Sequence, residues 1–395
     1  MSKGERRRVT LGIERLCGEE KSLVEGARVG LVCNQASVTH ELVHSADLLA
    51  AAGGVNLTAL FGPQHGIRGD VQDNMIETPH AYDRETGRPV YSLYSETREP
   101  TEEMLEGLDV LVCDLQDVGC RIYTFVYTIA NCMRVAGRLG KRVIVCDRPN
   151  PINGLGVEGN LLEPEFASFV GQFPIPTRHG LTPGELARMF RDLWGIECEL
   201  DVVGLINWER RLWYDETDLL WVMPSPNIPT LDSATVFPGT VHLEGTLVSE
   251  GRGTTRPFEL VGAPYVRGED LARYLEELRL PGVKFRAAYF LPTFQKHAGE
   301  TCGGVQIHVT DREEFRPALT GVAIVKAMLE LYGEDFQWKQ PPYEYVEDRL
   351  PFDVIAGTDR LRLSLLGGAS LSEVEEWWRP EVRAFSEQRE KYLLY

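Results

Sequence analysis

Four short apolar runs, each followed by polar or turn-forming residues, dominate the hydrophobic pattern of the first 150 positions. They are Arg28–Cys33, Val55–Phe61, Val110–Leu115 and Val143–Cys146. Short apolar runs that end at turn residues are typical of buried strands. Between the last two runs, Thr124–Leu139 repeats apolar residues at near-helical spacing, which predicts a crossover helix and a βαβ unit. The pattern therefore predicts parallel strands whose carboxyl ends share one edge of a sheet.

A strong helix start follows in the same half of the chain. Thr182 is placed as an N-cap, Pro183 occupies the first helical position, and Glu185 completes a capping box. This helix is predicted to run to about Trp194 and to stop at Gly195. The loop before it contains His179. The unpaired backbone amides and the dipole at a helix N-terminus favour anions, so His179 could belong to a binding site. A histidine that only caps the helix or packs against it is the alternative.

The amino-acid composition of the chain changes from Met223 onward. The stretch from Met223 to Gly239 contains four prolines and predicts an extended, semi-rigid connector. The next stretch, Leu243–Glu259, is glycine-rich and charged, which fits either a ligand-binding segment or a charged hairpin. The remainder, Tyr265–Tyr395, mixes predicted helices with β-like runs. The helices are Gly268–Leu278, Arg316–Tyr332 and Ser372–Tyr392, and the clearest β-like run is Val305–Val309.

These patterns predict an α/β protein of two domains. The first, residues 1–230, is expected to hold a Rossmann-like parallel sheet with the catalytic residues at the carboxyl ends of its strands. The second, residues 231–395, is expected to be a smaller α+β domain that closes over the first. A chain of 395 residues with 43% hydrophobic residues has the size for two packed cores.

Charge and composition narrow the function classes. The formal charge of −18, from 41 basic and 59 acidic residues, argues against a nucleic-acid partner. No stretch approaches the roughly 20 apolar residues of a membrane helix, and the basic start, Met1–Arg8, does not lead into a signal-peptide core. We therefore expect a cytoplasmic protein that does not bind a membrane. The eight cysteines form no CxxC pair, which favours reduced core residues over zinc ligands or disulfides.

The richest chemistry lies in Phe61–Glu77, whose sequence is FGPQHGIRGDVQDNMIE. It follows a predicted strand, so its side chains are expected at the ligand crevice; a polar surface loop is the alternative. His65 and His80, with the acidic residues between them, would also suit a metal. Because no recognised ligand spacing supports such a site, we expect no metal here.

Several familiar motifs are missing from the sequence. It has neither a Gly-x-Gly-x-x-Gly motif after a strand nor GxxxxGK[ST], which argues against a dinucleotide or nucleoside triphosphate. It also lacks the GxSxG elbow of α/β-hydrolases. After these exclusions, we expect a binding cleft that needs no cofactor and is rich in carboxylates, arginines and tyrosines. Side chains of these types suit carbohydrate chemistry.

Six sequence blocks resemble the exo-β-N-acetylmuramidase (NamZ) family, formerly a domain of unknown function. They are FGPQHGIRG, YSLYSETREPTEEML, DLQDVGCRIYTFVYT, DRPNPING, MPSPNIPTLDSA and EGTLVSEGRGTTRPFE, within about residues 10 to 265. The resemblance implies a Rossmann-like N-terminal domain and a C-terminal domain that brings arginines to the cleft between them. It also implies removal of N-acetylmuramic acid from non-reducing ends of peptidoglycan fragments during cell-wall turnover and recycling, without metal or nucleotide.

One position departs from that family. Many members carry Glu in the first motif, as their proposed catalytic acid, where this chain has Gln64. An amide cannot donate a proton as a carboxylic acid does. The carboxyl groups available to replace it are Asp70, Asp73, Glu77, Glu96 and Asp117. We favour Glu77 and Asp117, facing each other across the edge of the sheet, with Gln64 and His65 beside them.

Gln64 also leaves two alternatives open: a non-catalytic protein that binds muropeptides or sugar acids, and a hydrolase of another bond in a cell-wall fragment. Arginines would bind the lactyl carboxylate of the sugar, amides its acetamido group, and tyrosine rings its face. Tyr127 lies within the predicted helix Thr124–Leu139 and is expected to pack against the core rather than to contact the substrate. The predicted substrate contacts are Asn34, Arg68, Asp73, Tyr94, Arg121, Tyr123, Asp147, Arg148, Asn150, His179, Asn227, Glu250, Arg252 and Arg256.

Overall fold

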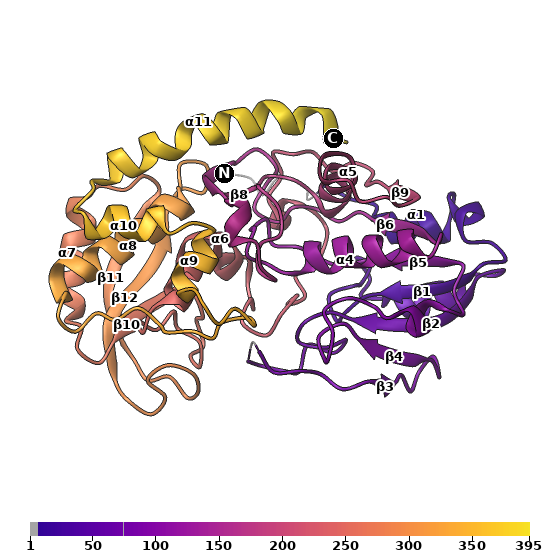
Figure 1. The fold of residues 1–395 in the computed structure, drawn as a ribbon, viewed down its shortest axis with the longest axis horizontal. Helices are drawn as coiled ribbons and strands as arrows, with labels where there is room; N and C mark the ends of the chain where they lie inside the picture. Colours follow the sequence, from indigo (N-terminus) through magenta and orange to yellow (C-terminus); the bar gives the residue numbers. More distant parts are fainter. Residues whose placement is uncertain (1–6, 74) are drawn as a thin grey trace.

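A seven-stranded sheet forms the centre of the N-terminal part of the chain (Figure 1). The computed structural model describes residues 7–73 and 75–395. In spatial order the strands are β3 (Ala81–Tyr82), β4 (Pro89–Ser92), β2 (Asn56–Gly62), β1 (Arg28–Val32), β5 (Val110–Cys113), β6 (Arg142–Cys146) and β9 (Leu200–Val203). Every neighbouring pair is parallel except β3 and β4. The four predicted strands are confirmed as β1, β2, β5 and β6.

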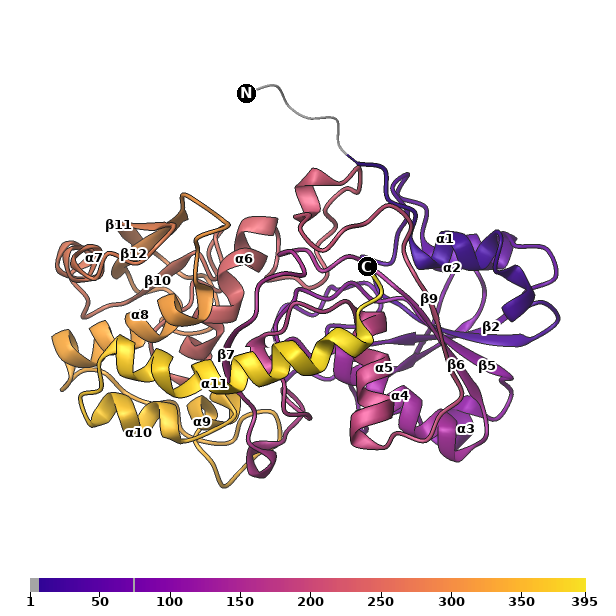
Figure 2. The ribbon, with the colours of Figure 1, turned by 90° about the horizontal axis from the view of Figure 1, so that it is seen from above.

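Helices cover both faces of this sheet (Figure 2). Alternate residues along β5 and β6 point to opposite faces, so Val112 and Ile144 join one core while Leu111 and Val143 join the other. On the first face lie α1 (Gly12–Cys17) and α2 (Ser45–Ala51). On the second lie α3 (Glu102–Leu105), α4 (Phe125–Arg138) and α5 (Pro183–Trp194). This layering confirms the predicted doubly covered α/β architecture.

The helix predicted after Thr182 is confirmed together with its cap. Thr182 Oγ1 accepts a hydrogen bond from the Glu185 backbone N–H at 3.3 Å, and Glu185 Oε2 accepts one from the Thr182 N–H at 2.9 Å. The helix ends at Gly195, whose φ of 67° lies in the left-handed region that favours glycine.

The C-terminal part is built on an antiparallel sheet of three strands, ordered β10 (Leu260–Ala263), β12 (Cys302–Val309) and β11 (Val283–Phe290). The helices of this part are α7 (Gly268–Glu277), α8 (Pro317–Tyr332), α9 (Pro351–Ala356), α10 (Arg360–Leu366) and α11 (Leu371–Arg389), of which α7 packs directly on β11 and β12. This arrangement confirms the smaller α+β part that the sequence predicted. The division at residue 230 stays our proposal for where one domain ends.

The proline-rich connector was predicted wrongly in its second half. Leu231–Thr240 forms a helix, α6, although Pro238 lies inside it. Thr230 caps the helix by accepting a hydrogen bond from the Ser233 N–H at 3.1 Å. A Cβ at Gly239 would lie 2.0 Å from the Pro317 carbonyl oxygen, so α6 packs very closely on α8. Tertiary packing thus overrides the weak helix propensity of this stretch.

The segment after α6 also differs from the hairpin that we considered. Residues 246–259 fold as successive turns, and Ser249 pairs with Gly262 rather than with a residue of the same stretch. Gly251 and Gly253 have φ values of 81° and 80°, which a larger side chain would adopt only with strain. Three charged side chains of the segment, Glu250, Arg252 and Glu259, are buried, whereas Arg256 is exposed.

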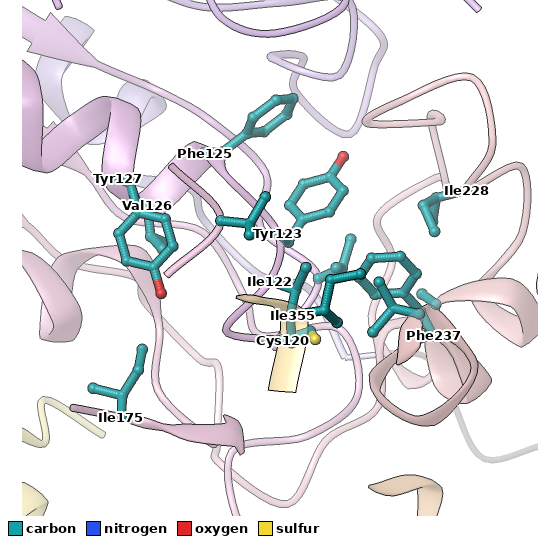
Figure 3. Close-up of a cluster of buried hydrophobic side chains, with 14 of the residues drawn as sticks. Cys120, Ile122, Tyr123, Phe125, Val126, Tyr127, Ile175, Ile228, Phe237 and Ile355 are labelled. Atoms are coloured by element: carbon teal, nitrogen blue, oxygen red, sulfur yellow. The ribbon is translucent and has the colours of Figure 1, made fainter. Parts of the chain in front are cut away.

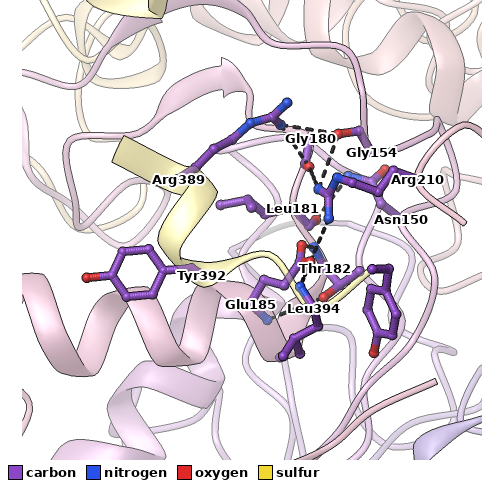
Figure 4. A network of polar contacts seen from close by, with 12 residues as sticks. Asn150, Gly154, Gly180, Leu181, Thr182, Glu185, Arg210, Arg389, Tyr392 and Leu394 are labelled. Atoms are coloured by element: carbon purple, nitrogen blue, oxygen red, sulfur yellow. Dashed lines mark hydrogen bonds and ion pairs between the residues drawn. The ribbon is translucent and has the colours of Figure 1, made fainter. Parts of the chain in front are cut away.

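The last helix returns across the molecule and joins its two parts (Figures 1 and 2). α11 packs on α8 and on β7 (Glu158–Leu161), which pairs with β8 (Pro176–Arg178). Figure 4 shows where it ends: Arg389 donates hydrogen bonds to the carbonyl oxygens of Gly154 at 3.2 Å and Gly180 at 2.9 Å. These contacts fix the C-terminal part against the sheet-bearing part.

Residues 1–6, on which most of the signal-peptide prediction rests, lie outside the described residues. Within the described chain, no helix has both the length and the apolar character needed to span a membrane.

Candidate active site

A narrow cavity of about 50 Å³ lies between the two parts of the chain. Both parts contribute polar side chains to its lining. The N-terminal part supplies Gln64, His65, Tyr123, Thr124, Ser225 and Asn227, and the C-terminal part supplies Glu244, Arg252, Tyr343 and Glu344. Phe125, Phe237 and Phe258 form apolar walls beside them. A few polar groups set among aromatic walls are the usual make-up of a small-molecule site.

The turn after β2 brings Gln64 and His65 into this cavity. β2 ends at Gly62, where a Cβ would lie 2.8 Å from the backbone nitrogen of Ile67, so the chain can fold back tightly. His65 itself has a φ of 71°, a left-handed conformation that is uncommon for residues other than glycine. Its Nδ1 lies 2.8 Å from the Val71 carbonyl oxygen.

His65 is held in its neutral form. Burial lowers the pKa of His65 to about 4, and the nearby Arg252 charge acts in the same direction. Because its Nδ1–H donates to Val71, the Nε2 atom is left as a hydrogen-bond acceptor. His65 can therefore accept a hydrogen bond from a sugar hydroxyl or amide.

Gln64 links the two parts of the chain. Its Oε1 accepts a hydrogen bond from Thr124 Oγ1 at 2.9 Å, and its Nε2 donates to Glu344 Oε1 at 3.2 Å. The hydroxyl of Thr124 thus orients the amide so that its NH₂ group faces the carboxylate. Gln64 holds Glu344 from one side.

Glu344 is a buried carboxyl group that reaches the cavity from the C-terminal part. It is only 3% exposed, and Tyr94 donates a hydrogen bond to its Oε2 at 2.8 Å. Burial raises the pKa of Glu344, and the neighbouring Glu244 adds to the rise, although the bonds from Tyr94 and Gln64 oppose it. Glu344 and Tyr345 both have positive φ values, of 44° and 67°. Such strain is typical of functional sites.

The loop that carries Glu344 is anchored on the N-terminal part by a cation between two rings. The Arg98 guanidinium lies 4.1 Å from the ring centroid of Tyr94 and 4.1 Å from that of Tyr345. The Tyr345 hydroxyl also donates to Glu77 at 3.3 Å. Glu344 is therefore placed by contacts on both sides of it in the sequence.

A buried network of opposite charges forms the other wall. Arg252 pairs with Glu244 and, at 3.2 Å, with Glu250, which in turn binds Lys296 at 2.7 Å. Tyr343 donates its hydroxyl to Glu244 at 2.9 Å. Burial alone would raise the pKa of Glu250, but Lys296 and Arg252 hold it below its ordinary value. This wall has as many cations as carboxylates.

Aromatic rings pack edge to face in the wall of the cavity, and Figure 3 labels two of them, Tyr123 and Phe237. Tyr123 and Phe237 lie 6.0 Å apart at 89°, and Phe237 and Phe258 lie 4.7 Å apart at 86°. Figure 3 shows the Tyr123 and Tyr127 hydroxyls pointing in different directions. Tyr123 lines the cavity, whereas Tyr127 stacks with Phe190 at 6.2 Å, which confirms the packing role predicted for it.

The structure gathers seven of the predicted site residues at this cavity. Gln64, His65, Tyr123, Asn227 and Arg252 line it. Tyr94 and Glu250 each contact a lining residue directly, at Glu344 and Arg252.

Six predicted site residues are instead bound to partners outside the cavity, all within the sheet-bearing part except two contacts of Arg121. Asp147 accepts hydrogen bonds from Thr182 and the Gly184 N–H, Arg148 pairs with buried Asp114, and Asn150 donates to the Leu181 carbonyl. Arg121 donates to the carbonyl oxygens of Asn160, Ile175, Ile355 and Ala356. His179 lies 3.4 Å from Asp117, and both are almost fully buried. These partners indicate structural roles.

The remaining five predicted residues do not belong to the lining of the cavity. Asn34 donates to the Pro224 carbonyl, Asp73 accepts from Gln295, and Arg256 pairs with Glu259. Arg68 lines surface hollows beside Asp83, and Glu77 pairs with Arg98 at 3.4 Å. The Glu77 side chain is 51% exposed while that of Asp117 is 1% exposed, so their surroundings differ greatly.

Sequence reasoning did not single out Glu344, Tyr343 or Phe258 as site residues, and it noted Glu244 only as one charge of the glycine-rich segment Leu243–Glu259. Glu344 lies in PPYEYVEDRLP, beyond the blocks that carry the resemblance. A glutamate between two tyrosines, bounded by prolines, was the available signal for a shaped loop. Among the described residues, no group of three or more His, Cys, Asp or Glu side chains is placed to hold a metal ion.

Comparisons with known proteins agree over almost the whole chain. Two family models match, described as "Exo-beta-N-acetylmuramidase NamZ, N-terminal" over residues 29–232 and "Exo-beta-N-acetylmuramidase NamZ, C-terminal" over residues 235–395. The peptidoglycan β-N-acetylmuramidase NamZ of Bacillus subtilis is 45% identical over 388 residues, covering 98% of this chain and 92% of that protein.

Two crystal structures of DUF1343 family proteins from Bacteroides fragilis share the fold. One has a TM-score of 0.89 and 38% identity, covering 99% of this chain and all of that one. The other has a TM-score of 0.78 and 28% identity, covering 98% and 99% of the two chains. The chain belongs to the exo-β-N-acetylmuramidase NamZ family of glycosidases.

Proposed function

We propose that this chain removes N-acetylmuramic acid from the non-reducing ends of peptidoglycan fragments, in the cavity between its two parts. One observation carries the assignment: both matched family segments supply polar side chains to the same cavity. Gln64 and Asn227 come from the first segment, and Glu244, Arg252 and Glu344 from the second. A cavity enclosed from both sides suits the end of a glycan rather than its middle.

Substrate entry requires movement at this cavity. Sites for small molecules usually hold about 300–1,000 Å³, whereas this cavity has about 50 Å³. The loop around Tyr343, Glu344 and Tyr345 is the part that must shift, because it closes the cavity through single side-chain contacts to Gln64, Tyr94 and Arg98. We infer that the structure represents a closed state.

The lining suggests which groups hold the sugar. Gln64 and Asn227 carry amides that suit the acetamido group, and neutral His65 offers an acceptor to a hydroxyl. Of the arginines that the sequence offered for the lactyl carboxylate, Arg252 lines the cavity. It is therefore the proposed partner of that carboxylate. Tyr123 presents its hydroxyl and ring from the wall.

The two alternative functions that Gln64 left open, a non-catalytic binding protein and a hydrolase of another bond, lose their main support. A binding protein or a hydrolase of another bond was motivated by the missing glutamate at this position. Glu344 places a buried carboxyl 3.2 Å from the Gln64 amide. The cavity therefore has a carboxyl of its own at that point.

Activity on a defined muramide tests the function. The purified chain is expected to release N-acetylmuramic acid from para-nitrophenyl N-acetyl-β-muramide and from a disaccharide with N-acetylmuramic acid at its non-reducing end. Both products are measured by chromatography, with the N-acetyl-β-glucosaminide as the comparison substrate. A folded protein that is inactive on every β-hexosaminide contradicts the proposal, and tight calorimetric binding of N-acetylmuramic acid without turnover favours the binding-protein alternative.

We further propose that the reaction takes place in the cytoplasm, serves cell-wall recycling and needs no metal. All eight cysteines are free, six of them buried, which supports a reducing compartment. Activity is expected to survive exhaustive dialysis against EDTA, and the protein to fractionate with cytoplasmic markers. Loss of activity that Zn²⁺ or Mg²⁺ restores would refute metal independence.

A further inference from the structure

We propose that Glu344, supplied by the C-terminal part of the chain, is the acid that protonates the leaving oxygen during glycosidic cleavage. The inference rests on the proposed function and names a residue for its central step. Gln64 acts as a positioning residue that holds the carboxyl, while Glu77 and Asp117 take no part in the proton transfer.

Glu344 differs from the other carboxyls of the cavity in its partners. Glu244 and Glu250 are ion-paired with Arg252, and Glu250 also with Lys296. Among the described residues, the hydrogen bonds to the Glu344 carboxyl oxygens come from two uncharged donors, the Tyr94 hydroxyl and the Gln64 amide. A carboxyl group without a cation against it can keep its proton, and a general acid must hold a proton to give.

The charged and titratable groups that act on Glu344 come from three stretches of the chain: Tyr94 with Arg98, Glu244, and Tyr343. Glu244 and burial both favour the protonated carboxyl, whereas Arg98 and the Tyr94 hydroxyl favour the ionised one. Tyr343 stays a phenol, because burial and the carboxylates beside it raise its pKa well above the ordinary value. The balance raises the pKa of Glu344. As pH rises through that pKa the acid is lost, so kcat/KM must fall on the alkaline side.

Gln64 suits this role because an amide does not titrate. Its orientation is set by Thr124, which donates to Oε1 and leaves the NH₂ group facing Glu344. A carboxyl at position 64 would instead share a proton with Glu344, as two close carboxyls do. Gln64→Glu is therefore expected to move the alkaline limb of the pH profile upwards.

The reaction balances with one water molecule. The bond between the anomeric carbon and the glycosidic oxygen breaks, its electron pair stays on that oxygen, and the Glu344 proton neutralises it. Water then supplies the oxygen of the new anomeric hydroxyl; one of its protons stays there and the other returns to the Glu344 carboxylate.

Leaving-group dependence separates an acid from a residue that only supports the fold. A nitrophenolate leaves without protonation, whereas a sugar alkoxide needs a proton in the transition state. Glu344→Gln is therefore expected to lower kcat on the natural disaccharide by about 10²–10⁴-fold and on 2,4-dinitrophenyl N-acetyl-β-muramide far less. It should also remove the alkaline limb. Glu344→Asp should restore part of the activity on the disaccharide.

Glu347→Gln, an exposed position on the same loop, is the matched control and should leave both substrates unaffected. Equal losses of Glu344→Gln on the two substrates, or an unchanged alkaline limb, would overturn the assignment of Glu344. Wild-type protein that hydrolyses neither muramide would instead refute the proposed function itself, so the two failures are distinguishable.

Discussion

Replacing Arg252 with methionine is expected to lower the free energy of unfolding by about 3–5 kcal/mol, the usual cost of removing one partner from a buried ion pair. Arg252 is 7% exposed and pairs with both Glu244 and Glu250, which are also buried. Without the guanidinium, Lys296 remains as the cation bound to Glu250, and Glu244 loses its pair with Arg252. Urea unfolding followed by circular dichroism measures the change.

The same substitution should also weaken catalysis, since Arg252 lines the cavity and sets the charge of its wall. Arg256→Met is the matched control, because Arg256 pairs with neighbouring Glu259 and its side chain is 48% exposed. A surface pair of this kind contributes about 0–1 kcal/mol. If Arg252→Met unfolds at the same urea concentration as Arg256→Met, the buried network does not stabilise this part of the chain as argued.

Arg121→Met is expected to destabilise the fold by a similar or larger amount. Arg121 is fully buried and donates hydrogen bonds to four carbonyl oxygens, at 2.7 Å to Asn160, 3.0 Å to Ile175, 3.2 Å to Ile355 and 2.7 Å to Ala356. The Ala356 carbonyl keeps a second donor, the Asn160 amide at 2.8 Å. Each of the other carbonyls costs about 1–3 kcal/mol if it is left buried without a donor. Because two of the four belong to α9 or its end, the substitution also loosens the contact between the two parts.

Arg138→Met is the comparison for Arg121→Met, since its side chain is 59% exposed and lies 3.6 Å from Glu99. Only Arg121→Met should shift the urea midpoint. The contrary result would be a normal midpoint together with a raised KM for muramides but not for glucosaminides. That outcome would return Arg121 to the lactyl-binding role that the sequence suggested.

Much of the fold was predictable because its signals are local. The apolar runs of β1, β2, β5 and β6 and the capping box at Thr182 each determine structure within a few residues. α6 was missed for the opposite reason. Its prolines argue against a helix, and the packing of Gly239 against the start of α8, 78 residues later, decides in its favour.

The site was only partly predictable, because its two walls come from distant parts of the chain. Gln64 and His65 were identifiable from their position after a strand, and Arg252 from its glycine-rich surroundings. Glu344 is 280 residues from Gln64, and no local sequence pattern predicts the hydrogen bond between them. The amino-acid sequence also does not distinguish an arginine that binds carbonyl groups in the core, such as Arg121, from one that faces a cavity, such as Arg252.

A structure of the Glu344→Gln variant with intact muramyl disaccharide tests the central claim most directly. We predict that the terminal N-acetylmuramic acid lies in the cavity between the two parts, with its glycosidic oxygen within hydrogen-bond distance of the residue at position 344 and the loop around Tyr345 displaced or reclosed over it. A disaccharide bound elsewhere, for example in the surface hollow beside Arg68 and Asp83, would contradict it.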